Sequence, residues 1–475
     1  MDGVGGAAEP VLSLAPHTKN KKTFYNMCGI FGVYNHKEAA NITYLGLYAL
    51  QHRGQESVGI AVSNGKEIMT YVGMGLVADV FDRNVLSKLS GEIAIGHVRY
   101  STSGSSELRN AQPITVKCSV GQISIAHNGN LINADRLRKK LESGGSIFQT
   151  NSDTEVILHL LAKTSHSASG IVKGLLQVLP QVRGAYSLLI LTPESLIAIR
   201  DPWGVRPLCI GKLNSSYVIS SESCAFDLIG AKFIREIDPG EIIVIDKKGV
   251  SNYFIPVERE NYAYCIFEFI YFSRPDSKVF GQTVHMVRKR LGHELFKENP
   301  IPADMVISIP DSANSVAIGY AEASRIPFDT GLIRNHYVGR TFIEPKQSIR
   351  DFGAKIKYNP VKELLNNKRI VVLDDSIVRG TTSRKLIRML RSAGAKEIHL
   401  NISCPPIKHP CFYGIDTPTE KELIASTYSV NEICEFIEAD SLHYISLEGM
   451  IRATGMNGKD FCLACFTGKY PIGRG

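Results

Sequence analysis

The sequence has no run of 18 apolar residues, so we expect neither a transmembrane helix nor a membrane partner. A net charge of +8 over 475 residues is mild, and the basic residues are too scattered to predict nucleic acid binding. Ten scattered cysteines are too few for a disulfide scaffold and favour a reduced cytoplasm with free, catalytic or metal-bound thiols. Internal repeats are also lacking, and the 44% hydrophobic content is typical of a globular chain with two to three domains.

Residues 1–27 lack the apolar segment of a secretory signal, and their lysines follow the weakly apolar PVLSLAP, which reverses the usual order. The same segment contains no arginine and one serine, whereas an organelle transit peptide is rich in both. We therefore expect a removable or disordered extension, with a targeting peptide as the alternative.

Two patterns divide the rest of the chain near residues 256–262. Residues 28–256 are rich in short or alternating apolar runs, such as GEIAIGHVRYST and GQISIAHNGNL, with a few helical stretches. This pattern predicts an α+β domain with packed sheets. In residues 257–475, apolar strands such as ADMVISIP and RIVVLDD alternate with helices, which predicts an α/β domain with a parallel sheet.

The most specific local signal is RIVVLDDSIVRGTTSRKLIRMLRSAG, residues 369–394. It predicts a buried strand and then a helix that ends before Gly394, a residue suited to the position after a helix C-cap. Asp374 and Asp375 follow the strand, at the end where open α/β sheets bind ligands. The loop 379–383 then brings glycine and hydroxyl groups to a helix N-terminus, which is typical of a phosphate site.

This segment resembles the phosphoribosyl diphosphate (PRPP) signature of type I phosphoribosyltransferases. The resemblance implies that PRPP is bound by one run of residues and a distant arginine, namely Asp374, Asp375, Arg379, Gly380, Thr381, Thr382, Ser383 and Arg340. It also implies one Mg²⁺ per subunit at Ser312, Asp374 and Asp375. The stretch 334–357 is strongly basic, and we expect it to close over the anion as a lid, with a solvated surface loop as the alternative.

The stretch NMCGIFGVYN places Cys28 directly after Met27. If the chain were cut between these residues, Cys28 would gain a free α-amine, whose pKa of about 7.7–8.0 suits a base near neutral pH. The thiol would then have its own proton acceptor and would need no histidine partner. A buried structural cysteine at a strand start is the alternative for Cys28 considered alone.

Downstream segments favour the catalytic interpretation: QHRGQES, GHVRYSTSG, AHNGNL and NSDTE. Arg99 could clamp a carboxylate, and Asp153 could accept an ammonium. The Asn128 side chain with the Gly129 N–H could stabilise an oxyanion. Together with RDPWGVRPL, these segments resemble the class II glutamine amidotransferases. The resemblance implies a four-layer (αββα) N-terminal-nucleophile fold, with catalytic residues Cys28, Asn128 and Gly129 and glutamine-binding residues Arg99, Thr102 and Asp153.

A class II glutaminase followed by a type I phosphoribosyltransferase is similar to the amidophosphoribosyltransferase family over residues 28–475. The resemblance implies that glutamine releases ammonia in the first domain and that ammonia displaces diphosphate from C1 of PRPP in the second. The products would be 5-phosphoribosylamine, diphosphate and glutamate, in the first committed step of purine synthesis. It further implies feedback inhibition by purine nucleotides, a homotetramer and an internal path for ammonia.

The cysteines of the second domain include one C-x-x-C pair, in FCLACF, which on residue type alone is compatible with zinc, a redox pair or no function. Four thiolates suit zinc and a [4Fe–4S] cluster equally well. One branch of the family has such a cluster and a propeptide, and the resemblance implies cluster ligands at Cys265, Cys411, Cys462 and Cys465. It also implies that residues 1–27 are a propeptide.

Three cysteines of the first domain, Cys118, Cys209 and Cys224, are expected to be inert core residues. Two other functions stay open. A different class II amidotransferase would need a sugar-isomerase or ATP-pyrophosphatase domain, and DDSIVRGTTS argues against both. A non-enzymatic PRPP or nucleotide sensor is disfavoured because candidate catalytic residues are present in both domains.

Overall fold

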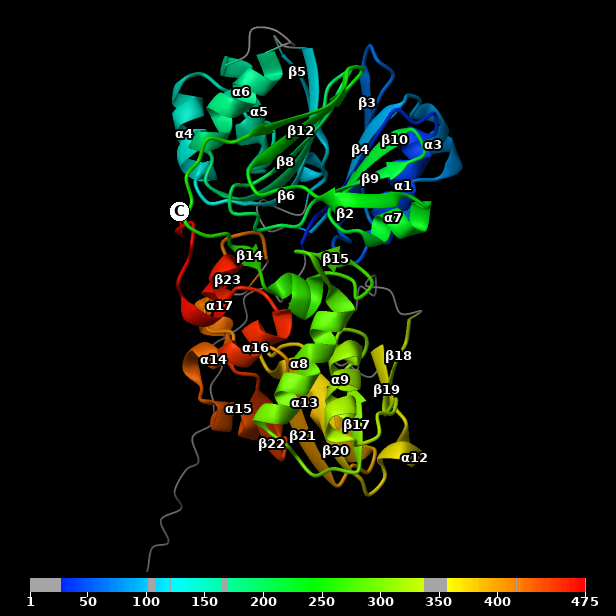
Figure 1. Ribbon diagram of the computed structural model, residues 1–475, viewed down its shortest axis with the longest axis vertical. Coiled ribbons are helices and arrows are strands. Elements are labelled where there is room, and N and C mark those ends of the chain that lie inside the picture. Colours follow the sequence, from blue (N-terminus) through cyan, green and yellow to red (C-terminus); the bar gives the residue numbers. More distant parts are fainter. Residues whose placement is uncertain are drawn as a thin grey trace, which may run out of the picture.

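The computed structural model in Figure 1 describes residues 27–100, 107–118, 121–164, 170–336, 357–415, 417 and 419–474. Of the expected propeptide only Met27 is among the described residues, and Thr102, Arg340 and most of the expected lid lie outside them. Two sheets of the first half lie at the top of Figure 1, and a separate sheet of the second half lies at the bottom. None of the described helices is long and apolar enough to cross a membrane.

Two antiparallel sheets form the first half of the chain within the described residues. The seven-stranded sheet has the order β11-β9-β10-β1-β4-β2-β3. Its strands are β1 (Gly29–Tyr34), β2 (Ser57–Ser63), β3 (Ile68–Met74), β4 (Ile93–Arg99), β9 (Cys209–Leu213), β10 (Ser216–Ser220) and β11 (Lys232–Glu236). The six-stranded sheet has the order β13-β12-β8-β7-β6-β5. Its strands are β5 (Ile114–Cys118), β6 (Gly121–Leu131), β7 (Gly184–Leu191), β8 (Leu196–Arg200), β12 (Glu241–Asp246) and β13 (Gly249–Phe254).

Helices cover the outer face of each sheet. The seven-stranded sheet is covered by α1 (Ala39–Ala49), α2 (Val77–Val80), α3 (Arg83–Lys88) and α7 (Cys224–Ile229), and the six-stranded sheet by α4 (Ala134–Ser143), α5 (Thr154–Thr164) and α6 (Ile171–Val178). A third apolar cluster, which includes Ile30, Ile95, Leu189 and Ile243, lies between the two sheets because alternate strand residues point inward. The order helix, sheet, sheet, helix confirms the predicted αββα fold.

The second half contains a parallel sheet in the order β17-β20-β21-β22, which confirms the predicted α/β fold. Its strands are β17 (Met305–Ser308), β20 (Arg369–Asp374), β21 (Glu397–Ile402) and β22 (Ser441–Tyr444). Its main helices are α8 (Val284–Glu298), α9 (Asn314–Ser324), α13 (Thr381–Ser392), α15 (Val430–Ile437) and α16 (Leu447–Thr454). The predicted role of Gly394 is also confirmed, since it follows the α13 C-cap with a φ of 101°.

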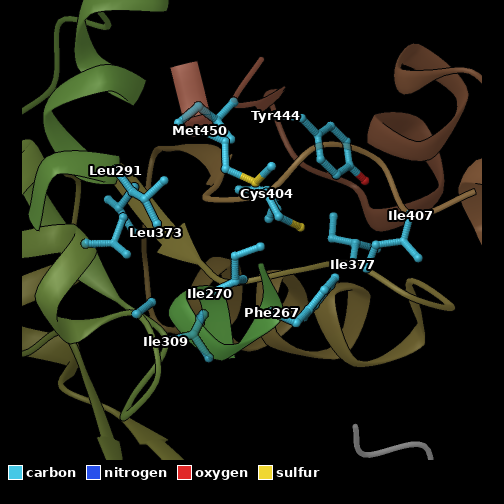
Figure 2. Packing of buried hydrophobic residues seen from close by; sticks show 14 of the residues in the cluster. Phe267, Ile270, Leu291, Ile309, Leu373, Ile377, Cys404, Ile407, Tyr444 and Met450 are labelled. Carbon is cyan, nitrogen blue, oxygen red and sulfur yellow. The ribbon is translucent and has the colours of Figure 1, made fainter. Parts of the chain in front are cut away.

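Short elements complete the second half: β14 (Tyr264–Cys265), η4 (Glu268–Phe272), β15 (Lys278–Val279), β16 (Gln282–Thr283), β18 (Leu332–Arg334), β19 (Tyr358–Pro360), α12 (Lys362–Leu365), α14 (Ile424–Thr427), β23 (Phe461–Cys462) and α17 (Ala464–Thr467). β14 and β23 pair in parallel and bring the two ends of this half together. The π-helix η4 packs against α8, and its Phe269 contacts Phe461 of β23. Figure 2 shows Phe267 and Ile270, from this segment, in the same apolar core as Leu373 at the end of β20.

The two halves of the chain share one apolar core. Met27, Ala185 and Val205 of the first half belong to the cluster that fills the second half. The last strand of the first-half sheets ends at Phe254, and the boundary near residues 256–257 stays a prediction.

The expectation for the first-domain cysteines holds only in part for Cys118. This last residue of β5 packs against the edge of the apolar core but is half-buried, with Sγ donating to the Gly121 carbonyl oxygen at 3.7 Å. Cys209 and Cys224 are buried, as predicted, and burial raises the pKa of both thiols. These two thiols are therefore inert near neutral pH.

Candidate functional sites

Cys28 lies directly before β1, and its side chain is buried. Its Sγ donates to the carbonyl oxygen of Tyr100 at 3.6 Å, just beyond the end of β4. Burial raises the pKa of the Cys28 thiol, and the nearby Arg99 guanidinium opposes only part of that rise. The thiol therefore needs a base before it can act as a nucleophile, which is the part expected of a free α-amine.

Asn128 and Gly129 lie in β6 of the other sheet, and Ser221 links them to β1. Ser221 Oγ accepts from the N–H of Ile30 at 3.0 Å and from Asn128 Nδ2 at 3.5 Å. Asn128 Oδ1 is buried and has no hydrogen-bond partner within the described part of the chain. Gly129 has a φ of 151°, and a Cβ there would lie 2.0 Å from the Ala185 carbonyl oxygen. Only glycine fits this close approach between β6 and β7.

Asp153 is buried just before α5. Its Oδ2 accepts from the N–H of Leu131 at 2.8 Å, and its Oδ1 lies 3.7 Å from His127 Nδ1. Burial raises the pKa of the Asp153 carboxyl, but His127 and backbone N–H groups outweigh that effect, so the pKa is lowered overall. Arg99 is buried at the end of β4, and both its charge and that of Asp153 act on the Cys28 thiol. The first half thus brings a cation and an anion to the thiol.

Two buried residues inside the motifs quoted above, His127 and Arg53, were not predicted to have a role. His127 of AHNGNL is buried and neighbours Asp153. Arg53 of QHRGQES is fully enclosed, and its Nε donates to the Cys28 carbonyl oxygen at 3.0 Å. The sequence did contain a signal for Arg53: an arginine placed between an apolar helix and a buried strand is expected to be buried, and a buried arginine needs a carboxylate partner. The sequence does not name that partner, because Glu268 lies 215 residues away.

The acids of the second half lie where two parallel strands end side by side. Ser312, in the loop after β17, donates to Asp375 Oδ1 at 2.6 Å, and Ser376 donates to Asp375 Oδ2 at 2.6 Å. Asp374 Oδ1 accepts from the Asp375 N–H at 2.9 Å. Burial raises the pKa of both carboxyls, and the charge of Asp375 raises that of Asp374 further. The three expected Mg²⁺ ligands are therefore together, as a buried acid pair that a cation would stabilise.

The Gly-Thr loop leads directly into α13. Gly380 is the N-cap of this helix with a φ of 72°, a conformation that favours glycine. Thr381, Thr382 and Ser383 form the first turn, whose N–H groups have no intrahelical partner and suit a phosphate. Arg379 Nη2 donates to Glu422 Oε1 at 2.5 Å, so in this structure it pairs with an acid at the rim of the loop.

One small cavity is bordered by all four expected cluster ligands, Cys265, Cys411, Cys462 and Cys465. Its other walls are mainly apolar, with the guanidinium of Arg206 beside the thiols. Burial raises the pKa of Cys265 to about 11 even though Arg206 opposes it, and burial raises that of Cys465 well above its ordinary value. Within the described residues no three cysteine, histidine, aspartate or glutamate side chains converge on one point as for a single metal ion. Four cysteine thiols around one space are the donor type that iron–sulfur clusters use.

The loop that carries Cys411 also contacts the first half. Asn130 Nδ2 donates to the Phe412 carbonyl oxygen at 2.9 Å. A Cβ on Gly414 would lie 2.9 Å from the backbone of Gly129, so this glycine allows the cysteine loop to rest on the strand that carries the expected oxyanion donors.

Comparison with known proteins identifies relatives along nearly the whole chain. The family model described as a glutamine amidotransferase domain matches residues 97–227. The amidophosphoribosyltransferase of Methanocaldococcus jannaschii is 51% identical over 461 residues, covering 94% of this chain and 98% of the relative. That of Bacillus subtilis is 49% identical over 450 residues, covering 94% of each chain. The solved structure of the B. subtilis glutamine PRPP amidotransferase, complexed with ADP and GMP, superposes with a TM-score of 0.89 at 48% identity, covering 94% of this chain and 98% of that one.

Proposed function

Because the chain belongs to the amidophosphoribosyltransferase family, we propose how its own residues divide the work of the family reaction. The enzyme hydrolyses glutamine and transfers the ammonia to C1 of PRPP, which gives 5-phosphoribosylamine, diphosphate and glutamate in purine synthesis. This division is supported by the presence of one buried reactive group in each half: a thiol directly before β1 in the first, and an acid pair at the end of β20 in the second.

In the first half, Cys28 is the nucleophile and its own α-amine is the base. The amine takes the thiol proton, and the thiolate sulfur attacks the carboxamide carbon of glutamine. Asn128 Nδ2 and the Gly129 N–H donate to the oxyanion that forms. Collapse of this intermediate expels ammonia, which leaves with the proton from the amine, and water then hydrolyses the thioester to glutamate and free thiol.

Two charges hold the amino-acid end of glutamine. Arg99 binds the α-carboxylate and Asp153 binds the α-ammonium, and the lowered pKa of Asp153 keeps it charged for that purpose. Thr102, which lies outside the described residues, is proposed to complete this pocket.

In the second half, ammonia attacks C1 of PRPP and diphosphate leaves. Asp374 and Asp375 accept hydrogen bonds from the ribose hydroxyls, and the first turn of α13 binds the 5-phosphate through its N–H groups. Arg379 is proposed to exchange its Glu422 partner for the ligand, and Arg340 to reach it from the basic stretch. Ser312 and the two aspartates would hold one Mg²⁺, which would neutralise charge on the departing diphosphate.

Cys265, Cys411, Cys462 and Cys465 would hold a [4Fe–4S] cluster, which would link three segments of the second half. The alternative of zinc gives a colourless protein, so iron content and absorbance distinguish them. We further propose that residues 1–27 are a propeptide removed after Met27, since an amide nitrogen at Cys28 is not a base. Met27 is fully buried, and its N–H donates to the Arg53 carbonyl oxygen at 3.1 Å.

Regulation and assembly follow the family in this proposal. Purine nucleotides inhibit the enzyme, as suggested by the ADP and GMP in the B. subtilis structure, and the active form is a cytoplasmic homotetramer. The central test is PRPP-dependent release of glutamate from glutamine by anaerobically purified protein. Formation of phosphoribosylamine from free ammonia without glutamate release would leave the second half assigned and refute the first.

A further inference from the structure

A cluster of buried charges crosses the junction between the two halves. Arg53 and Glu222 belong to the first half, and Glu268 is the first residue of η4 in the second half. The side chains of all three are completely shielded from solvent. Arginine and glutamate are rarely so enclosed unless each is paired. The burial of this cluster therefore calls for a structural or functional explanation.

Arg53 uses its whole guanidinium fork in this cluster. Its Nη1 donates to Glu222 and, at 3.0 Å, to Glu268 Oε2, while its Nη2 donates to Glu268 Oε1 at 2.9 Å. The third guanidinium nitrogen, Nε, donates to the Cys28 carbonyl oxygen. A bidentate bond to a carboxylate fixes the plane of the guanidinium, and therefore also the direction of Nε.

Glu268 is itself held firmly from the second half. Ser273 Oγ donates to Glu268 Oε2 at 2.6 Å. Arg288, on α8, donates from Nε to the Phe269 carbonyl oxygen at 2.6 Å and from Nη2 to the Ser273 carbonyl oxygen at 2.8 Å. The π-helix that presents the carboxylate is thus braced at both ends, and it packs into the core seen in Figure 2.

The bond to the carbonyl of Cys28 governs where the reacting atoms point. Cα is bonded directly to this carbonyl carbon, so a fixed carbonyl restricts the position of Cα. Rotation about the Cα–C bond then sets the direction of the α-nitrogen, and rotation about Cα–Cβ adds to it for Sγ. The Met27 N–H also binds Arg53, but cleavage after Met27 would remove that contact. In the mature enzyme, the Arg53 Nε bond would then be the direct link between this arginine and the nucleophile.

We propose that Arg53 is a positioning residue for the Cys28 nucleophile and that Glu268, from the phosphoribosyltransferase half, orients Arg53. The inference rests on the proposed role of Cys28. It means that a residue of the second half controls the chemistry of the first without touching glutamine. An error of about 1 Å in the position of a reacting group costs up to about 10²-fold in rate, which sets the scale of the effect.

The test is Glu268→Gln, which keeps the size of the side chain and removes its charge. We expect kcat for glutamine-dependent synthesis to fall about tenfold or more, with the KM for glutamine unchanged within about twofold, because the pocket that binds glutamine is untouched. Ammonia-dependent synthesis should stay within about twofold of wild type, because the PRPP site is intact. Equal losses with both nitrogen donors, or no loss with glutamine, would overturn the proposal.

Glu241→Gln is the matched control. Glu241 is also a buried glutamate with a bidentate arginine partner, Arg235 at 2.6 and 2.7 Å, but both residues lie within the first half and away from Cys28. The ratio of the glutamine-dependent rate to the ammonia-dependent rate in Glu241→Gln should equal that of wild type. Intact-mass measurement of every variant ensures that proteins with the same first residue are compared.

A double variant separates orientation from a general loss of stability. Arg53→Lys keeps the charge but loses the fork, so the glutamine-dependent kcat should fall as in Glu268→Gln. Adding Glu268→Gln to Arg53→Lys should cause little further loss, since both act on one link. Fully additive losses would contradict the inference. Cys28→Ala is tested separately, and retention of glutamine use by that variant would refute the proposed function whatever Glu268 does.

Discussion

The two halves of this chain bury the carboxylates of their proposed sites in opposite ways. Asp153 has an N–H donor and His127 beside it, so its pKa is lowered despite burial. Asp374 and Asp375 are adjacent, and burial raises the pKa of both. Protein groups therefore stabilise the charge of the first carboxylate, whereas burial disfavours the charge of the second pair, which an incoming cation would stabilise.

This difference suggests how each half recognises its substrate. Glutamine brings a zwitterionic end with one charge of each sign, which suits a site whose Arg99 and Asp153 are already charged. PRPP with Mg²⁺ brings hydroxyls and a cation, which suits an acid pair with oxygens to spare. The predictions below test the proposed residues of each site in turn.

The largest expected effect comes from Cys28→Ala. Glutamine-dependent synthesis should fall by about 10³-fold or more, since the nucleophile is lost. Ammonia-dependent synthesis should persist, because its site lies in the other half. Loss of the ammonia-driven reaction in a folded variant would contradict the proposed division of labour. The same variant should retain residues 1–27 if the thiol performs the cleavage, which intact-mass measurement checks.

The reciprocal change is Asp374→Asn combined with Asp375→Asn. PRPP affinity measured by calorimetry should fall by roughly 10²-fold, because two charge-assisted contacts are lost at about 1.5 kcal/mol or more each. Glutamine hydrolysis should remain detectable at a low level. Asp304→Asn is the control, since Asp304 is exposed at the opposite end of β17 and pairs with Arg369 at 3.2 Å. Unchanged PRPP affinity in the double variant would sink the assignment.

The cysteine cavity gives the next largest effect. Cys462→Ser should remove the brown colour and lower the melting temperature by roughly 5–10 °C, because the thiolates staple segments that are far apart in sequence. Cys434→Ser is the control, since Cys434 lies on α15 outside the cavity. A wild-type protein with stoichiometric zinc and no iron would refute the cluster.

The sequence predicts the parts of this architecture that depend on local pattern. Alternating apolar runs such as GQISIAHNGNL correspond to β6, and RIVVLDD followed by a Gly-Thr loop corresponds to β20 and the start of α13. Strand period, glycine at positive φ and a strand-to-helix junction are all encoded within a few residues. The fold class of both halves could therefore be predicted, and so could the candidate residues of the PRPP loop.

The contacts that join the two halves could not be predicted in this way. Arg53 with Glu268, and Gly414 against Gly129, pair residues from opposite halves of the chain. Such pairs depend on how two domains dock, and neither hydrophobic period nor turn chemistry specifies docking. The half-buried position of Cys118 was missed for a related reason, because burial at a strand end depends on what packs beyond it.

The smallest effect concerns Asp153 and tests the contrast between the carboxylates most directly. Its pKa is lower in the folded protein than the value of about 3.9 of the unfolded chain, so its charge stabilises the fold above that pH. This contribution is lost as the pH falls through the folded pKa. Asp153→Asn should therefore lower the melting temperature at pH 7 by about 2–6 °C, equivalent to about 1–2 kcal/mol. The difference from wild type should narrow below about pH 4. Asp135→Asn, on the exposed face of α4, should show no such trend, and a gap for Asp153→Asn that is independent of pH would mean that His127 and the backbone donors do not stabilise its charge.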